Sequence, residues 1–323
     1  MEKIKMERMT ALEILNCHER IQPYIHNTPI LTSRLVDKKI GASVFFKAEN
    51  VQRAGAYKIR GATNAILQLT DTQKSKGVVT HSSGNFAQAL SLAAQSLGIA
   101  AHIVMPKTAP EVKKVGVKEY GGNIYLCEPT LAARQAMADD ISLRTGATFI
   151  HPSNDENVIL GQGTAAIELL REQPDLNFIF CPVGGGGLIA GSALAAKFFG
   201  NNCSVIGGEP YEADDAYRSL LSGKIEDNET VNTIADGLKT TLGDKNFPII
   251  KNLVSKIVRV QEAEIVAAMR LVWERMKIII EPSSAVTVAA VLREAEENPN
   301  HLKGKKIGII ISGGNVDLEK LPF

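Results

Sequence analysis

Cysteine is scarce in this 323-residue chain, and the four cysteines that it has are scattered. Cys17, Cys127, Cys181 and Cys203 form no CxxC pair. Zinc sites and disulfide frameworks need clustered or regularly spaced cysteines, so both are disfavoured. Isolated thiols are instead typical of proteins that work in a reducing compartment.

A charge of one sign and long apolar runs are also lacking. Lys and Arg number 36 against 35 Asp and Glu, so the basic excess typical of nucleic-acid binding is absent. No apolar run approaches the roughly 20 residues that span a bilayer, and the first residues lack the apolar centre of a signal peptide. Apolar residues make up 45% of the chain, which is enough for a sizeable core. We expect a cytoplasmic globular protein that binds neither nucleic acid nor membrane.

Short apolar strands alternate with amphipathic helices along the chain. Thr10 and Glu13 form a capping box that predicts a first helix, and Pro23 ends it. The predicted strands cover residues 44–50, 77–83, 101–106, 123–128, 148–153, 177–183, 204–209, 256–260 and 306–312. The predicted later helices cover residues 86–98, 131–146, 163–173, 188–200 and 263–276. This alternation predicts an α/β fold with mostly parallel sheets that carry helices on both faces.

Three of the predicted strands end in loops rich in glycine and serine. These loops are HSSGN at 81–85, GGGG at 184–187 and SGGNVD at 312–317. In open α/β sheets, ligands bind beyond the carboxyl ends of the strands, where such loops gather. The three loops therefore predict one small-molecule site.

The run Gly184, Gly185, Gly186 and Gly187 lies between a strand and a helix. Without Cβ atoms, this backbone can turn sharply and offer several N–H groups to one anion. The start of a helix adds partial positive charge, so a phosphate is the expected ligand.

A dinucleotide is an alternative ligand for the same loop. Gly185, Gly187 and Ala190 satisfy the G-x-G-x-x-A pattern, and Glu209 ends the next strand, where a ribose-binding acid is expected. The pattern is weak, because Gly161, Gly163 and Ala166 match it too. A P-loop, an HExxH motif and a GxSxG nucleophile elbow are all absent from the sequence.

Lys58 lies among small residues, in AGAYKIRGATNAI, at the expected start of a helix. A lone lysine is most often a solvated surface charge. A lysine that condenses with a carbonyl compound needs a neutral amine, which partial burial and a nearby cation such as Arg60 would favour.

Taken in order, AYKIRGA at 56–62, THSSGN at 80–85, the four-glycine loop and SGGNVD resemble the serine/threonine dehydratase family of fold-type II pyridoxal-phosphate enzymes. The resemblance covers nearly the whole chain. It is strongest toward the serine racemase branch, through TAPEVKKVGVKEYG, EPYEADDAY, TIADGLKT and LVWERMKIIIEP. It implies a tryptophan synthase β-like fold of two open, mostly parallel twisted sheets flanked by helices. The large cofactor-binding domain would comprise residues 1–70 and 156–323, and the small domain residues 71–155.

The resemblance also implies how pyridoxal 5'-phosphate is held. Lys58 would carry it as a Schiff base, and the glycines at 184–187 would bind its phosphate. Ser312 would meet the pyridine nitrogen, and Asn85 the hydroxyl side of the ring. Because a serine need not keep that nitrogen protonated, the ring would be a weaker electron sink than it would be beside a carboxylate.

The implied reaction is the interconversion of L- and D-serine, accompanied by β-elimination of serine to pyruvate and ammonia. Ser82, Ser83 and Asn85 would hold the substrate carboxylate. Racemisation needs an acid/base group on each face of the substrate Cα, which by resemblance are Lys58 and Ser83. Arg134 matches an arginine near the substrate site of the racemases.

Phe86 is a departure from the family pattern, because most relatives carry a histidine there. A hydrocarbon ring cannot donate a hydrogen bond to a substrate, so the choice among serine, threonine and 3-hydroxyaspartate is open.

Two further sites are implied by the resemblance. Glu209 and Asp215 flank Ala213, and carboxylates with a backbone carbonyl suit Mg²⁺, Ca²⁺ or Mn²⁺. An ATP effector site would use Gln88, Tyr120, Arg275, Lys277 and Asn315. A homodimer is expected on the same basis.

Three alternatives to a serine racemase stay open on the sequence. The first is an L-threonine/L-serine or threo-3-hydroxyaspartate ammonia-lyase with little racemase activity. The second, from another class, is an NAD-dependent dehydrogenase built on the G-x-G-x-x-A pattern. The third is a non-catalytic amino-acid-binding protein.

Overall fold

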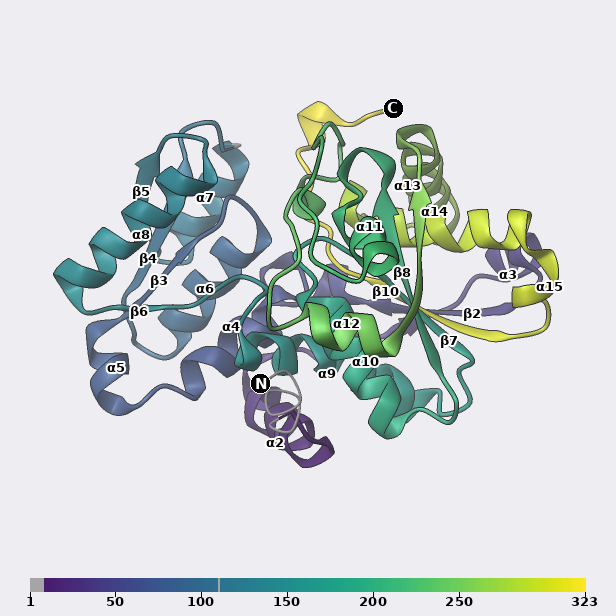
Figure 1. Ribbon diagram of the computed structural model, residues 1–323, viewed down its shortest axis with the longest axis horizontal. Coiled ribbons are helices and arrows are strands. Elements are labelled where there is room, and N and C mark those ends of the chain that lie inside the picture. Colours follow the sequence, from purple (N-terminus) through teal and green to yellow (C-terminus); the bar gives the residue numbers. More distant parts are fainter. Residues whose placement is uncertain (1–8, 110) are drawn as a thin grey trace.

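The computed structural model describes residues 9–109 and 111–323. Within those residues the strands form a six-stranded and a four-stranded sheet, which lie side by side in Figure 1. The strands are β1 (Ile30–Leu31), β2 (Ser43–Ala48), β3 (Val78–His81), β4 (Ala101–Pro106), β5 (Asn123–Cys127), β6 (Thr148–Phe149), β7 (Phe178–Pro182), β8 (Ser204–Pro210), β9 (Val254–Val260) and β10 (Lys306–Ile311).

The larger sheet has the strand order β1-β2-β10-β7-β8-β9. The two-residue strand β1 is antiparallel to β2, and the other strand pairs are parallel. Near its centre, Ile309 of β10 pairs with Phe46 of β2 on one side and with Phe180 of β7 on the other. All three side chains are buried. These strands read as continuous apolar runs because both faces of the sheet are covered.

Helices of very different lengths surround the two sheets. They are α2 (Ala11–Ile21), α3 (Arg34–Ile40), α4 (Lys58–Leu67), α5 (Asp71–Lys76), α6 (Asn85–Ser96), α7 (Glu111–Glu119), α8 (Leu131–Thr145), α9 (Glu156–Glu172), α10 (Gly187–Phe199), α11 (Asp215–Ser222), α12 (Phe247–Leu253), α13 (Glu262–Met276), α14 (Pro282–Glu297) and α15 (Pro299–Leu302). On the larger sheet, α2, α9, α10 and α12 share one apolar core, and α3, α13 and α14 share the core of the other face. None of the helices described is long and apolar enough to cross a membrane.

The smaller sheet has the order β5-β4-β3-β6, with all strands parallel. Helices α4, α6 and α7 pack into one of its cores, and α8 packs into another. The four strands all fall within residues 71–155, the predicted small domain. The exact division of the chain into two domains stays a prediction.

Most predicted elements are present, and the differences have local causes. The capping box of Thr10 and Glu13 begins α2 as predicted. Helix α9 begins at Glu156, ahead of the predicted residue 163, because the Asp155 carboxylate accepts from two backbone N–H groups of the first turn. Strand β6 is shorter than the predicted 148–153, because the chain then turns so that His151 Nδ1 accepts from two backbone N–H groups.

The second G-x-G-x-x-A match lies inside α9 and serves helix packing. A Cβ built on Gly161 would lie 2.5 Å from Gly61 Cα in α4, and one built on Gly163 would lie 2.5 Å from the carbonyl oxygen of Gly191 in α10. These glycines therefore allow three helices to approach closely.

Candidate active site

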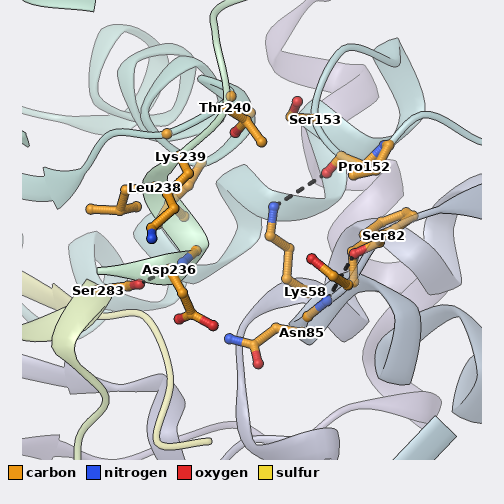
Figure 2. Close-up of a pocket in the computed structure, with 18 of the residues that line it drawn as sticks. Lys58, Ser82, Asn85, Pro152, Ser153, Asp236, Leu238, Lys239, Thr240 and Ser283 are labelled. Carbon is orange, nitrogen blue, oxygen red and sulfur yellow. Dashed lines mark hydrogen bonds between the residues drawn. The ribbon is translucent and has the colours of Figure 1, made fainter. Parts of the chain in front are cut away.

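A cavity of about 390 Å³ lies at the carboxyl ends of β3, β7 and β10. The loops after β3 and β7 and Ser312 after β10 all line it, as do residues 57–58, 151–153 and 236–241. The three predicted loops thus meet at one site, although they come from two sheets. Figure 2 shows Lys58 projecting among the polar side chains of this cavity.

Lys58 begins α4 and points its amine into the cavity. Its Nζ donates to the carbonyl oxygen of Pro152 at 3.2 Å (Figure 2). The amine also lies 5.0 Å from the centre of the Tyr57 ring and 5.9 Å from that of Phe86. Burial lowers the pKa of the Lys58 amine to about 8, and the negative charge of Glu281 opposes part of that shift. The fraction of neutral amine that condensation requires is therefore raised.

The predicted role of Arg60 in this shift is wrong. The Arg60 side chain is fully buried and turned away, toward Glu49 and Glu168. Four N–H···O contacts of 2.7 Å join its guanidinium to these two carboxylates. Two carboxylates so close neutralise the cation, and it does not figure in the pKa of Lys58. Arg60 instead fastens the first turn of α4 to the residues after β2 and to α9.

The four-glycine loop is shaped so that no side chain fits. A Cβ on Gly184 would lie 2.9 Å from the carbonyl oxygen of Gly237, and one on Gly187 would lie 2.9 Å from that of Ser153. Gly186 has φ of 80°, which an L-residue adopts only with strain. The loop ends at the N-terminus of α10, where partial positive charge favours an anion. This bare cradle fits the phosphate of pyridoxal phosphate.

Ser312 lies on the cavity wall, where it is held by Ser284. The two hydroxyl oxygens are 2.9 Å apart, and Ser284 Oγ also accepts from the backbone N–H of Gly313 at 2.7 Å. The Ser312 side chain is buried on this wall of the cavity, where its hydroxyl fits the predicted contact with a ring nitrogen.

Asn85 begins α6 and reaches across to two residues from distant parts of the chain. Its Nδ2 donates to Glu281 Oε1 at 2.7 Å, and its Oδ1 accepts from Asn315 Nδ2 at 3.0 Å. Asn85 also lines the cavity.

The predicted substrate residues surround the same space. Ser82, Ser83 and Arg134 line the cavity with Lys58. Ser82 Oγ accepts from the backbone N–H of Gly84 at 3.3 Å. Phe86 is almost completely buried and forms part of the wall, so it closes one side of the pocket with a hydrocarbon surface.

The two predicted metal-binding carboxylates are fully buried and lie beside each other. Burial and the neighbouring Asp215 raise the pKa of Glu209 well above its usual value, and burial raises that of Asp215 to about 7. Backbone N–H groups bind both carboxylates, those of residues 216 and 217 for Glu209 and that of Leu242 for Asp215. The described residues contain no cluster of three or more His, Cys, Asp or Glu side chains suited to a metal. A hard cation held by this pair and the Ala213 carbonyl stays a prediction.

The predicted nucleotide residues are not part of the cavity. Of these, Asn315 binds Asn85, Gln88 is buried in α6, and Arg275 is exposed on α13. Tyr120 and Lys277 are likewise absent from the cavity lining.

The dinucleotide interpretation of the glycine loop does not fit the structure. Glu209 is fully buried, and its carboxylate binds the backbone of α11 away from the cavity lining. It is therefore not placed to hold a ribose bound at the loop.

Several residues of the site have no signal in the sequence. Glu281, His151 and the ion pair of Lys113 with Asp236 all face the cavity. Burial lowers the pKa of His151 to about 4, so this ring is neutral. Each of these residues is an ordinary polar position until the fold brings distant segments together.

Comparison with known proteins identifies the family. The profile described as pyridoxal-phosphate dependent enzyme matches residues 21–313. The chain is 47% identical over 314 residues to the β-hydroxyaspartate dehydratase of Paracoccus denitrificans, covering 97% of this chain and 98% of that protein. It is 48% identical over 311 residues to the serine racemase of Arabidopsis thaliana, covering 96% and 94%. The crystal structure of serine racemase from Dictyostelium discoideum superposes with a TM-score of 0.90 at 48% identity, covering 96% of this chain and 99% of that one. The predicted fold class is thereby confirmed, and the chain belongs to the pyridoxal-phosphate-dependent enzyme family that includes the serine racemases.

Proposed function

We propose that this chain is a pyridoxal-phosphate-dependent serine racemase that also eliminates water from serine to give pyruvate and ammonia. The observation that carries the proposal is Lys58, whose amine has a lowered pKa and lies in one cavity with a side-chain-free cradle at the start of α10. The identity of nearly half of all residues with serine racemases supports the choice of reaction.

The chain's own residues would hold the cofactor in a fixed position. Lys58 would bind its aldehyde carbon, the loop 184–187 its phosphate, Ser312 its pyridine nitrogen and Asn85 its ring hydroxyl. When bound, pyridoxal phosphate supplies a conjugated system that delocalises the negative charge left on the substrate Cα.

Proton transfer at that Cα would fall to two residues. Lys58 takes or returns the α-proton on one face, and the Ser83 hydroxyl does so on the other, which inverts the centre. Ser82 and the backbone N–H groups at the start of α6 hold the substrate carboxylate. Elimination needs loss of the α-proton and of the β-hydroxyl, so water leaves, and hydrolysis of the product then releases pyruvate and ammonia.

The test is a direct assay of the purified chain. With pyridoxal phosphate and L-serine, we expect D-serine and pyruvate to accumulate and the protein to absorb visible light. Lys58→Ala should lose all three, whereas Lys197→Ala, at an exposed position of α10, should retain them. A colourless chain that converts no serine, or a Lys58→Ala variant with full turnover, would refute the proposal.

A 3-hydroxyaspartate ammonia-lyase is the second candidate function. Arg134 and Lys239 line the cavity and could balance a second substrate carboxylate. A relative named β-hydroxyaspartate dehydratase is as similar to this chain as the serine racemases are. Oxaloacetate formation from 3-hydroxyaspartate at a much higher kcat/KM than pyruvate formation from serine would favour this candidate.

A divalent cation at Glu209, Asp215 and the Ala213 carbonyl is part of the proposal. Two buried carboxylates beside each other repel, and a cation between them removes that repulsion. We expect Mg²⁺ or Ca²⁺ to raise the melting temperature of the chelator-treated protein by several degrees, because a ligand of the native state stabilises it. Asp215→Asn should lose that response. An equal melting temperature with and without cation would contradict the site.

Three further properties belong to the proposal. The ATP effector site and the homodimer rest on the resemblance alone, and the cytoplasmic location rests on the isolated cysteines and the lack of an apolar signal-peptide centre. Equilibrium sedimentation and serine turnover with and without ATP test the first two directly.

A further inference from the structure

Glu281 is a buried carboxyl group in the cavity wall that the reaction scheme above does not use. It is the residue before α14, and its side chain is 3% exposed. Oε1 accepts from Asn85 Nδ2 at 2.7 Å. Oε2 is buried and finds no hydrogen-bond partner in the described part of the chain. A buried oxygen without a hydrogen-bond partner lowers the stability of the folded chain. Such a carboxyl group in the wall of a binding cavity indicates a role in that site.

Glu281 and Asn315 together fix the orientation of the Asn85 amide. An asparagine amide has nearly the same shape when its oxygen and nitrogen are exchanged, so hydrogen bonds decide which way it points. Asn315 donates one N–H to Asn85 Oδ1 and the other to the carbonyl oxygen of Ala54 at 2.7 Å. Glu281 accepts from Asn85 Nδ2. A donor on one side and an acceptor on the other leave Asn85 a single orientation.

The fixed orientation leaves one N–H of Asn85 for a ligand. The Nδ2 group carries two hydrogens, and Glu281 takes one of them. Asn85 lines the cavity, and its second N–H has no acceptor among the residues described. An oxygen of a bound molecule fits that donor.

The backbone around Glu281 is adapted to its carboxyl group. A Cβ built on Gly313 would lie 2.8 Å from Glu281 Oε1 and 3.0 Å from Ala56 Cβ, so the glycine leaves room for the carboxyl group beside Asn85. The Glu281 backbone N–H donates to the carbonyl oxygen of Gly313 at 3.1 Å, which ties α14 to the loop after β10. The same loop carries Ser312 and Asn315.

The charged and ionisable groups near Glu281 come from several elements. They are Lys58 of α4 and the adjacent Tyr57, Lys113 of α7 and Asp236 of the turn 236–238. Burial and Asp236 raise the pKa of Glu281 to about 8, against the opposing influence of Lys113, Asn85 and Lys58. The carboxyl group is thus electrostatically coupled to the reactive amine.

We propose that Glu281 is a positioning residue for the cofactor, which with Asn315 turns the Asn85 amide so that an N–H group meets the ring hydroxyl oxygen of pyridoxal phosphate. The inference rests on the proposed function. Glu281 acts through Asn85 and transfers no proton to the substrate.

The test compares three variants of the full-length chain loaded with pyridoxal phosphate. Glu281→Met removes the acceptor at similar size, and Glu281→Gln keeps an acceptor but removes the charge. Glu294→Gln is the matched control, because Glu294 is 2% exposed on the same helix and pairs with Lys256 and His301 outside the cavity. The readouts are the equilibrium dissociation constant of pyridoxal phosphate and the visible absorption spectrum between pH 6 and 9.

We expect Glu281→Met to raise the dissociation constant about tenfold and to change the ratio of the visible absorption bands, because a hydrogen bond to the ring is misdirected. Glu281→Gln should retain most of the affinity yet lose the pH dependence of the band ratio. Glu294→Gln should match the wild type in both.

Two results would overturn the inference. One is a wild-type dissociation constant and spectrum in a folded Glu281→Met; where that variant does not fold, a tenfold higher dissociation constant in Glu281→Gln, which keeps the acceptor, decides against the inference. The other is an equal change in Glu294→Gln, which would show a general loss of stability. A wild-type chain that fails to bind pyridoxal phosphate would instead refute the proposed function.

Discussion

At the scale of single residues, the surroundings of Lys58 decide whether its amine can react. A lysine in water has a pKa of about 10.4, so almost none of its amine is neutral near pH 7. In this cavity, burial brings the pKa to about 8. The amine is neutral above that value and protonated below it, so its reactivity toward aldehydes rises with pH.

The first prediction concerns cofactor uptake. The rate at which the cofactor-free chain takes up pyridoxal phosphate, followed by visible absorbance, should rise from pH 6 and level off above pH 9, with a midpoint near 8. At pH 6 about 1% of an amine with that pKa is neutral, far more than for an ordinary lysine. Nα-acetyl-lysine under the same conditions is the control. A midpoint above pH 10 for the protein would show that burial does not tune this amine.

The second prediction separates the two faces of the substrate. Ser83→Ala removes a hydroxyl from the cavity wall and leaves Lys58 in place. Racemisation should fall at least 100-fold, while elimination of the enantiomer that Lys58 deprotonates should stay within about threefold of wild type. Chiral chromatography and a pyruvate assay measure the two. Equal loss of both reactions, as expected for Lys58→Ala, would contradict the role of Ser83.

At the scale of elements, the packing of α4 depends on a buried group of charges. Arg60 bridges Glu49, which follows β2, and Glu168 of α9. Lys47 Nζ lies 2.6 Å from Glu168 Oε2, and its side chain is fully buried. Two cations and two anions balance in this group, so removing one member leaves an uncompensated charge.

The third prediction follows from that balance. Arg60→Met should lower the free energy of unfolding by about 3–5 kcal/mol, measured by urea denaturation, because two carboxylates lose their partner away from water. Arg144→Met is the matched control, since Arg144 pairs with Asp140 on the surface of α8 at 61% and 55% exposure. Its effect should be about 0.5 kcal/mol or less. A similar loss of unfolding free energy in the two variants would mean that the buried charges stabilise the fold no more than a surface ion pair does.

The strands were largely predictable from the sequence, whereas helices α3, α5, α7, α11, α12, α14 and α15 are absent from the predicted ones. The capping box predicts helix α2, and the four glycines predict the loop of residues 184–187. Helix α14 is absent from the predicted helices, because it is buried through most of its length and shows no alternation of apolar and polar faces. Strand β1 has two residues, too few for any pattern.

The site residues that belong to a local sequence motif were predictable. Those whose role depends on a hydrogen bond between distant residues were not. Lys58 and the glycine loop belong to recognisable local segments. The partnership of Asn85 with Glu281 joins positions 196 residues apart, and its effect on orientation exists only once the two meet. The wrong assignment for Arg60 has the same origin, because sequence proximity to Lys58 says nothing of the direction in which the guanidinium points.

At the scale of the whole molecule, the cavity is bounded by parts of the chain that belong to different sheets. Lys113 belongs to α7, beside the four-stranded sheet. Its amine contacts the carboxylate of Asp236, which lies between β8 and β9 of the larger sheet. The lysine side chain is 9% exposed and that of Asp236 is 43% exposed. This ion pair joins the two sides at the cavity, where Asp236 is seen facing the interior in Figure 2.

The last prediction is that the pair holds the two sides together around the substrate. Asp236→Asn should raise KM for serine about three- to tenfold and leave kcat nearly unchanged, because a partly buried ion pair supplies about 1 kcal/mol and Asp236 has no part in proton transfer. Amide hydrogen exchange in α7 should quicken in the same variant. Glu128→Gln is the control, because its pair with Lys107 is exposed at 65% and 62% and lies outside the cavity lining. Unchanged KM and unchanged exchange in Asp236→Asn would show that the two sides are held by their apolar contacts alone.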